Sequence, residues 1–360
     1  MGYTTYLLGA GASANAIPPV KQMNSRIWEL LYLLQEFSNN NNIDNVKKYG
    51  YISFDYFQPF LDKIEKIITD ITFHFSIDTY AKKLYLTKPA DYNIIKHLIN
   101  LYILFEQMSI EEIQNQLNID YAIVKTKLIK KIGELKSNEL DKYRESNLDE
   151  RYDVLLASIY DKNLRMPKDL KIITYNYDNQ LEIANGYYTN YKSIYTQYLS
   201  VQNEDNDEIN IVKLNGFATF DRVKDIGKIE YDQNLNIIFS QEKILHQISK
   251  LYRVFNDQLT EPTNISFAWD ESLYSSMAID KAQRFILNSS NIVIIGYSFP
   301  EFNRKIDETI LKYINNYAKI YLQTEETSYS ILQDRLIQRA NNINQNNIIR
   351  VNYIDQFFIP

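Results

Sequence analysis

The chain contains no cysteine, and this absence excludes three kinds of chemistry. It can form no disulfide framework, no thiolate metal site and no thiol nucleophile. Histidine is scarce as well, because only His74, His97 and His246 occur among the 360 residues. Their wide separation matches none of the short spacings found in zinc-binding helices. We therefore expect no bound metal.

Long apolar segments are missing too. No stretch of about 18 residues is both apolar and uncharged, which is the minimum for a membrane-spanning helix. The first residues, MGYTTYLLGAGAS, lack the basic region, apolar stretch and small-residue cleavage site of a secretion signal. These features lead us to expect a cytoplasmic protein without membrane contact.

The chain also lacks an excess of positive charge. Its 39 Lys and Arg against 45 Asp and Glu give a net charge of −6, whereas nucleic-acid binders usually carry a basic face. A nucleic-acid partner is therefore not expected. One segment, Ser109–Leu135, keeps an alternative open, because it has the rhythm of a helix-turn-helix whose second helix could enter a major groove. Against this stands an amphipathic helix pair with a solvated lysine face, made by Lys125, Lys127, Lys130 and Lys131.

The apolar residues that are present, 45% of the chain, alternate between strand and helix patterns. Short β-type runs are separated by segments of helical periodicity, which is typical of a parallel sheet covered on both faces. We predict an α/β fold, a Rossmann-like parallel sheet with a large helical insertion after the first strand, over approximately residues 24–165. The predicted strands are 3–8, 171–175, 209–214, 291–296, 318–323 and an edge strand at 348–353.

The first predicted strand runs into a glycine-rich segment, Gly9-Ala10-Gly11-Ala12-Ser13, which fits G-x-G-x-x-A. Glycine lets the backbone approach a pyrophosphate closely, and a helix that starts there offers free N–H groups. No lysine follows at the position required by G-x-x-x-x-G-K-[ST], so the segment is not a P-loop. The acidic strand end expected about 20 residues later in dinucleotide folds is replaced by helical spacing at Ser25–Phe37. Either the glycines form a structural turn, or a nucleotide is held differently from that of ordinary dehydrogenases.

Polar groups also follow two later strands. Thr174-Tyr175-Asn176-Tyr177-Asp178 comes directly after one of them, and Gly296-Tyr297-Ser298 followed by Asn303 comes after another. In open α/β sheets, ligands bind in the crevice beyond the carboxyl ends of the strands. We therefore expect the three segments to converge on one crevice.

Five segments together carry a resemblance to a known family: GAGAS at 9–13, IDTYAKKLYL at 77–86, TYNYD at 174–178, KLNG at 213–216 and IIGYSFPEFN at 294–303. The chain resembles the sirtuin-like domains of bacterial antiphage defence proteins, a branch that hydrolyses NAD. The likeness covers nearly the whole chain, and residues 87–150 are its least diagnostic part. It implies that residues 1–360 form a single NAD-binding domain.

The resemblance also implies roles for particular residues. Gly9, Ala10, Gly11, Ala12 and Ser13 would lie against the phosphates of NAD, and Asn176 would lie beside the nicotinamide ribose. Thr174 and Asp178 would join the cofactor-binding residues, although Asp178 is also expected to orient the loop or cap the next helix. The adenosine half would lie near Gly296, Tyr297 and Ser298, with Asn303 close by.

The implied reaction is cleavage of the bond between nicotinamide and ribose, with NAD as the substrate. A positioned water attacks the ribose, and in the family a histidine in the motif KLHG acts as the base. This chain has Asn215 at that position, and a carboxamide does not titrate near neutral pH. We therefore expect impaired turnover, either in a disabled variant or in a natural sensor. The alternative interpretation is that Asn215-Gly216 is simply a turn after a strand.

The function that the resemblance implies is that of an abortive-infection NADase, held inactive until a phage cue releases it. Control would come from homo-oligomerisation or from a partner defence protein, an ATPase or a nucleotide-processing protein. The alternative is a non-catalytic subunit that binds NAD or ADP-ribose. Protein deacylation is disfavoured, because sirtuin deacylases carry a four-cysteine zinc ribbon that this chain cannot form.

Overall fold

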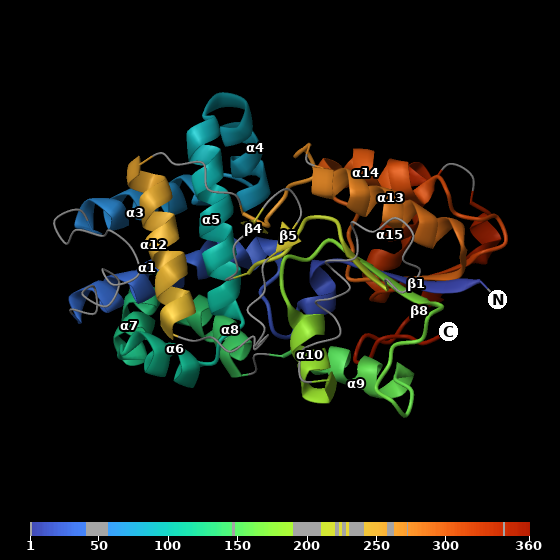
Figure 1. The fold of residues 1–360 in the computed structure, drawn as a ribbon, viewed down its shortest axis with the longest axis horizontal. Coiled ribbons are helices and arrows are strands. Elements are labelled where there is room, and N and C mark those ends of the chain that lie inside the picture. Colours follow the sequence, from blue (N-terminus) through green and yellow to red (C-terminus); the bar gives the residue numbers. More distant parts are fainter. Residues whose placement is uncertain are drawn as a thin grey trace.

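A computed structural model shows an α/β protein in which a parallel sheet with its covering helices adjoins a large helical layer (Figure 1). The structure describes residues 2–40, 57–145, 148–189, 210–219, 223–224, 228–229, 241–257, 263–271, 273–340 and 343–360. The Asn-rich segment at 41–50 and the acidic segment at 202–208 lie outside the described residues. So does residue 209 of the predicted third strand.

The main sheet has six parallel strands in the order β3-β2-β1-β6-β7-β8. The strand β1 lies near its centre, and the order reverses direction between β1 and β6, where a ligand crevice is expected in such sheets. All six predicted strands are confirmed, including β8 at the edge. Their bounds are β1 (Tyr3–Leu8), β2 (Leu170–Thr174), β3 (Ile211–Lys213), β6 (Ser289–Ile295), β7 (Lys319–Gln323) and β8 (Ile348–Val351).

Helices cover both faces of this sheet, which explains its continuous apolar strands. Tyr6 and Leu8 of β1 point to the face covered by α9 (Glu150–Ile159) and α10 (Gln180–Thr189). Leu7 points to the opposite face, where the covering helices are α13 (Leu273–Leu287), α14 (Arg304–Leu311) and α15 (Glu326–Arg339). A separate antiparallel pair joins β4 (Val223–Lys224) to β5 (Lys228–Ile229).

The predicted helical insertion between β1 and β2 is present, and it begins at Val20, four residues earlier than expected. In addition to α9, the insertion comprises α1 (Val20–Asn39), α3 (Phe57–Thr72), α4 (Ile77–Thr87), α5 (Pro89–Glu106), α6 (Ile110–Leu117), α7 (Tyr121–Ile132) and α8 (Glu134–Glu145). A further helix, α12 (Gln241–Asp257), packs against α3, α5 and α6 although it follows the third strand. The helical layer is thus built from two separate parts of the chain (Figure 1).

The segment with helix-turn-helix rhythm does form two short helices, α6 and α7. Ser109 and Glu112 form a capping box at the start of α6, and Asn118 takes a left-handed conformation between the helices. Three of the four lysines of this segment contact the chain itself: Lys125 pairs with Asp141, Lys127 with Glu36 at 3.7 Å, and Lys131 lies 3.8 Å from the ring of Trp28. These contacts favour the amphipathic helix pair over a groove-binding helix.

A cluster of four buried charges joins α1, α5 and α8. Arg26 Nε donates to Glu106 at 3.0 Å, and Arg144 Nε donates to Glu29 at 3.0 Å. Arg26 also pairs with Glu29, so two cations balance two anions at positions no more than 5% exposed. Burying ions is costly unless they are paired, so these four side chains fix how the three helices meet.

Within the described part of the chain, none of the helices combines the length and the apolar character that crossing a bilayer demands.

Candidate functional site

The segments that follow β1 and β6 are pressed together at their backbones. A Cβ atom on Gly9 would lie 2.6 Å from the carbonyl oxygen of Gly296, and one on Gly11 would lie 2.6 Å from Gly296 Cα. Gly296 itself has φ +62° and would place a Cβ 2.2 Å from the nitrogen of Ala12. Gly11 N–H donates to Gly296 O at 2.9 Å. The glycines therefore serve contact between the two strand ends, as the structural-turn interpretation predicts.

This packing bears on the predicted phosphate site. A four-residue 3₁₀ turn, η1 (Ala10–Ser13), follows Gly9, and the first α-helix, α1, starts only at Val20. The N–H groups of Gly9, Gly11 and Ala12 already donate to the carbonyls of Ile295, Gly296 and Gly9. Ala10 is exposed, as are Gly296 and Ser298. Phosphate contact with this segment stays a prediction, with few free N–H groups to support it.

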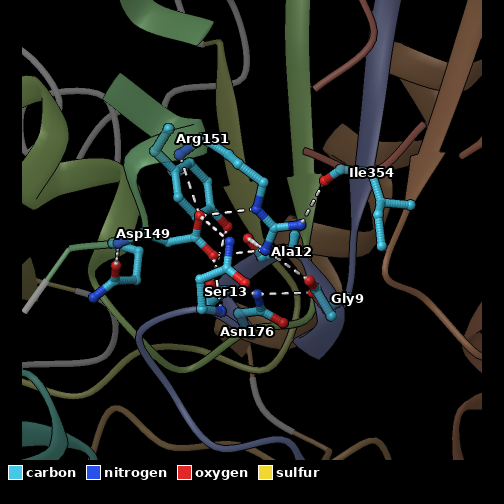
Figure 2. A network of polar contacts seen from close by, with 11 residues as sticks. Gly9, Ala12, Ser13, Asp149, Arg151, Asn176 and Ile354 are labelled. Atoms are coloured by element: carbon cyan, nitrogen blue, oxygen red, sulfur yellow. Dashed lines mark hydrogen bonds and ion pairs between the residues drawn. The ribbon is translucent and has the colours of Figure 1, made fainter. Parts of the chain in front are cut away.

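Asn176 lies where the ends of β1 and β2 meet (Figure 2). Its Nδ2 donates to Gly9 O at 3.0 Å and to Ser13 Oγ at 3.2 Å. A carbonyl oxygen can only accept a hydrogen bond, so the contact with Gly9 fixes the orientation of the amide. Asn176 Oδ1 accepts no hydrogen bond from the described residues, while the backbone N–H is held by Thr174 Oγ1 at 3.0 Å. The side chain is thus an acceptor of fixed orientation at the carboxyl ends of β1 and β2.

Ser13 connects Asn176 to a second polar group, the carboxyl of Asp178. The Ser13 hydroxyl lies 3.1 Å from the hydroxyl of Tyr152, and its interaction with the Asp178 carboxyl lowers the pKa of that carboxyl. Burial raises the pKa of Asp178 to about 6, although the charge of Lys213 opposes this shift. Asp178 also accepts the N–H of Gln180, the first residue of α10, at 3.2 Å, as the expected capping role requires.

Arg151 contacts the backbone of the glycine-rich segment (Figure 2). Its guanidinium donates to Gly11 O at 3.1 Å and to Ala12 O at 3.2 Å, and it pairs with Asp149 at 2.6 Å. A further bond to Ile354 O at 3.3 Å ties in the segment after β8. Arg151 was not predicted from the sequence, because no local pattern links it to Gly11, which lies 140 residues earlier in the chain.

Tyr297 and Asn303 take part in a different, buried network. The rings of Tyr175 and Tyr297 stack at 4.4 Å with an angle of 5° between them. Both hydroxyls donate to Asp307 Oδ1, at 2.5 and 2.6 Å, and Asn303 Nδ2 donates to the Tyr297 hydroxyl at 3.1 Å. Burial raises the pKa of Asp307 to about 7 despite these two hydrogen bonds and the charge of Arg339. The network links the segments after β2 and β6 to α14 on the face that α13 and α14 cover. Contact of Tyr297 and Asn303 with a cofactor stays a prediction.

Asn215 follows β3 in a turn next to the peptide that carries Asn176. Its Nδ2 donates to Tyr175 O at 2.9 Å, and this acceptor fixes the orientation of the amide as well. Asn215 Oδ1 is buried and accepts no hydrogen bond from the residues that the structure describes. Lys213, two residues earlier, pairs with Glu182 at 2.8 Å. The two asparagines that were predicted to act together are therefore at neighbouring strand ends.

The structure gathers the predicted residues into one region but divides them between two faces. Asn176, Ser13 and Asp178 cluster on the α9 and α10 side of the sheet, whereas Tyr297 and Asn303 lie on the other side. Among the residues that the structure describes, no three His, Asp or Glu side chains are grouped so as to hold a metal ion.

No model of a known protein family matches the chain, and searches of curated proteins and of solved structures return no match either. The resemblance to sirtuin-like NADases thus rests on the five sequence segments alone.

Proposed function

We propose that the crevice at the carboxyl ends of β1, β2, β3 and β6 binds NAD and belongs to an NAD hydrolase with reduced turnover. The observation that carries the proposal is Asn176, whose amide is locked by Gly9 and Ser13 so that an acceptor oxygen stays available. An acceptor fixed in this way suits a ribose hydroxyl or a water that attacks the ribose. The position beside the reversal of strand order, between β1 and β6, also supports a ligand there.

The reduced turnover follows from position 215. A general base must accept a proton near the working pH, and the amide of Asn215 cannot do so. Its Nδ2 is also committed to Tyr175 O. Asp178 is the titratable group that interacts with Ser13, but Asn176 itself donates to the Ser13 hydroxyl and not to Asp178. The proposed enzyme thus keeps its substrate-positioning group and lacks its base.

Restoring the base tests this function. The Asn215→His variant should release nicotinamide from NAD at least about 100-fold faster than the unsubstituted protein, the scale of general-base catalysis. Adding Asn176→Ala to that variant should abolish the gain, because the ribose and the water lose their positioning acceptor. Nicotinamide release is followed by chromatography. No gain in Asn215→His, although NAD binds, would reject the hydrolase.

That outcome would support the second candidate, a non-catalytic module that binds NAD or ADP-ribose. The fixed, non-titrating amide of Asn215 is the observation in its favour. The two candidates separate on binding alone, because the module should bind NAD and ADP-ribose without releasing nicotinamide in any variant. A role in phage defence, with a homo-oligomer or a partner protein as the control, rests on the resemblance and belongs to either candidate.

A further inference from the structure

The helix α5 is largely buried among apolar residues, yet one of its faces carries polar side chains. This polar stripe consists of four residues spaced by four or seven positions, the last of them directly after the helix ends: Tyr92, Lys96, Asn100 and Gln107. Side chains at such intervals lie on one face of an α-helix. A polar group that leaves water needs hydrogen-bond partners, so the contacts of the polar stripe show what this face of α5 holds.

The first half of the polar stripe binds Asp270, which lies in the segment before α13. The Tyr92 hydroxyl donates to Asp270 Oδ1 at 2.5 Å, and Lys96 Nζ pairs with Asp270 Oδ2 at 2.8 Å. The same Oδ2 accepts the N–H of Phe267 at 2.9 Å, and the N–H of Asp270 donates to Phe267 O at 2.8 Å. One carboxylate, whose side chain is only 12% exposed, thus connects α5 to the backbone of residues 263–270.

This segment also pairs with the turn that carries Asn215. Ser266 N–H donates to Asn215 O at 2.8 Å in an antiparallel bridge between the two. On the other side of the bridge, Phe217 N–H donates to Asn264 O at 3.1 Å. Glycine is required for this approach, because Gly216 has φ +72° and a Cβ there would lie 1.7 Å from Asn264 O. The first half of the polar stripe therefore reaches the Asn215 turn through one intervening segment.

The second half of the polar stripe contacts the segments after β2 and β3 directly. Asn100 Nδ2 donates to Thr219 O at 3.1 Å, and Asn100 Oδ1 accepts the N–H of Thr219 at 3.0 Å. Gln107 Oε1 accepts the N–H of Asn179 at 2.6 Å, and Asn179 Nδ2 donates to Ala218 O at 2.9 Å. Three backbone segments near the strand ends are thus held by side chains of one helix.

The apolar packing divides the segment after β3 along the same line. Leu214 belongs to the core between the sheet and α13, whereas Ala218, four residues later, belongs to the core of the helical layer. Phe267 of the intervening segment belongs to the helical core too. The Asn215 turn therefore lies at the point where the chain passes from the sheet to the helical layer, and α5 is part of that layer.

We propose that α5 couples the helical layer to the strand ends, so that loss of a contact on its polar stripe loosens the Asn215 turn. The members of the stripe are positioning residues: Tyr92 and Lys96 act through Asp270, and the others act on the backbone. The coupling concerns the segments themselves and does not depend on which ligand they bind. Control by an oligomer or a partner protein would then need only a contact that shifts α5.

Hydrogen exchange of the ligand-free protein tests this coupling, because the substitution and the readout lie on different elements. Lys96→Met keeps the aliphatic stem and removes the charge that pairs with Asp270. It should speed exchange of the Ser266 and Phe217 amides at least about tenfold, and the amides of β2 by less than about twofold. Lys88→Met, at a lysine whose side chain is 67% exposed just before α5, is the matched control and should change neither.

Two further variants separate positioning from general loosening. Lys96→Arg keeps the cation, so exchange should stay within about twofold of that of the unsubstituted protein. When Lys96→Met is combined with Asp270→Asn, the rate increase should fall short of the product of the two single increases, because both residues act through one ion pair. Asn100→Leu breaks the direct contact with Thr219 and should give the same local pattern at the Ser266 amide.

Unchanged exchange of the Ser266 and Phe217 amides in Lys96→Met would overturn the coupling. An equal rise in the amides of β2 would also overturn it, because the stripe would then only stabilise the fold as a whole. The result is separable from that of the proposed function. Local loosening in a protein that binds no NAD keeps the coupling and rejects the NAD site, whereas NAD binding without local loosening does the reverse.

Discussion

At the scale of single residues, the strand ends carry amides and carboxyls whose surroundings differ sharply. Asn176 and Asn215 are both fixed by backbone carbonyls, and each keeps an oxygen that no described residue satisfies. Asp178 and Asp307 lie on opposite faces of the sheet, and burial raises the pKa of each. The amides therefore present acceptor oxygens in fixed orientations, and the two carboxyls make the strand ends sensitive to pH.

Asp307 leads to a prediction for stability. Its pKa rises from 3.8 in the unfolded chain to about 7 in the folded protein, so between these values the folded state binds a proton that the unfolded state lacks. The stability contributed by this proton is complete below pH 4 and is lost as the pH rises through 7. At about 1.4 kcal/mol per pKa unit, the loss amounts to at most about 4 kcal/mol.

The Asp307→Asn variant should lack this part of the pH dependence. Urea unfolding at pH 5 and pH 8 should show a larger loss of free energy for the unsubstituted protein than for the variant. Asp334→Asn, at an exposed carboxylate of α15, serves as the control and should follow the unsubstituted protein. Parallel pH dependence in all three proteins would show that Asp307 does not titrate in this range.

At the scale of elements, glycines determine how the strand ends approach one another. Gly216 and Gly133 both have positive φ angles, of +72° and +87°, but only Gly216 faces a neighbour, because no atom lies within 4 Å of a Cβ built on Gly133. Gly133→Ala should therefore cost only the backbone strain, about 1–3 kcal/mol. Gly216→Ala should cost more by about 1–3 kcal/mol, the usual range for overpacking. Equal losses of unfolding free energy would contradict the close approach to Asn264.

The junction of α1, α5 and α8 gives a second prediction at this scale. Arg144→Met leaves Glu29 and Glu106 with one cation between them and should lower the free energy of unfolding by about 3–5 kcal/mol. Arg304→Met removes an arginine that pairs with Glu301 and Glu308 at the surface and should cost less than about 1 kcal/mol. Chemical denaturation measures both. A small effect of Arg144→Met would mean that water or helix movement compensates the buried carboxylates.

At the scale of the whole molecule, the sequence predicts the sheet well because most of its strands contain short buried apolar runs, such as Leu7–Leu8 in β1 and Ile292–Ile295 in β6. All residues of β2 are buried, and such a run between helical patterns is recognisable without a structure. The convergence of Gly9, Ser13 and Asn176 also followed from the parallel strand ends. By contrast, the packing of α12 into the helical layer depends on tertiary contacts that no local pattern carries.

At the candidate site, the placement of Tyr297 likewise could not be predicted from the local sequence. In β6, Val293 and Ile295 point to the α9 face, and strict alternation would send Tyr297 there too. The positive φ of Gly296 reverses the alternation, so Tyr297 joins the opposite face and donates to Asp307. A sequence shows that a glycine is present but not which conformation its neighbours impose.

We propose that NAD binds through Asn176 where the ends of β1, β2, β3 and β6 meet. Calorimetric titration of the unsubstituted protein with NAD measures this binding. We predict saturable binding that Asn176→Ala weakens at least about tenfold and that Asn288→Ala, at the opposite end of the sheet, leaves unchanged. No heat of binding, or equal affinity in all three proteins, would contradict the claim.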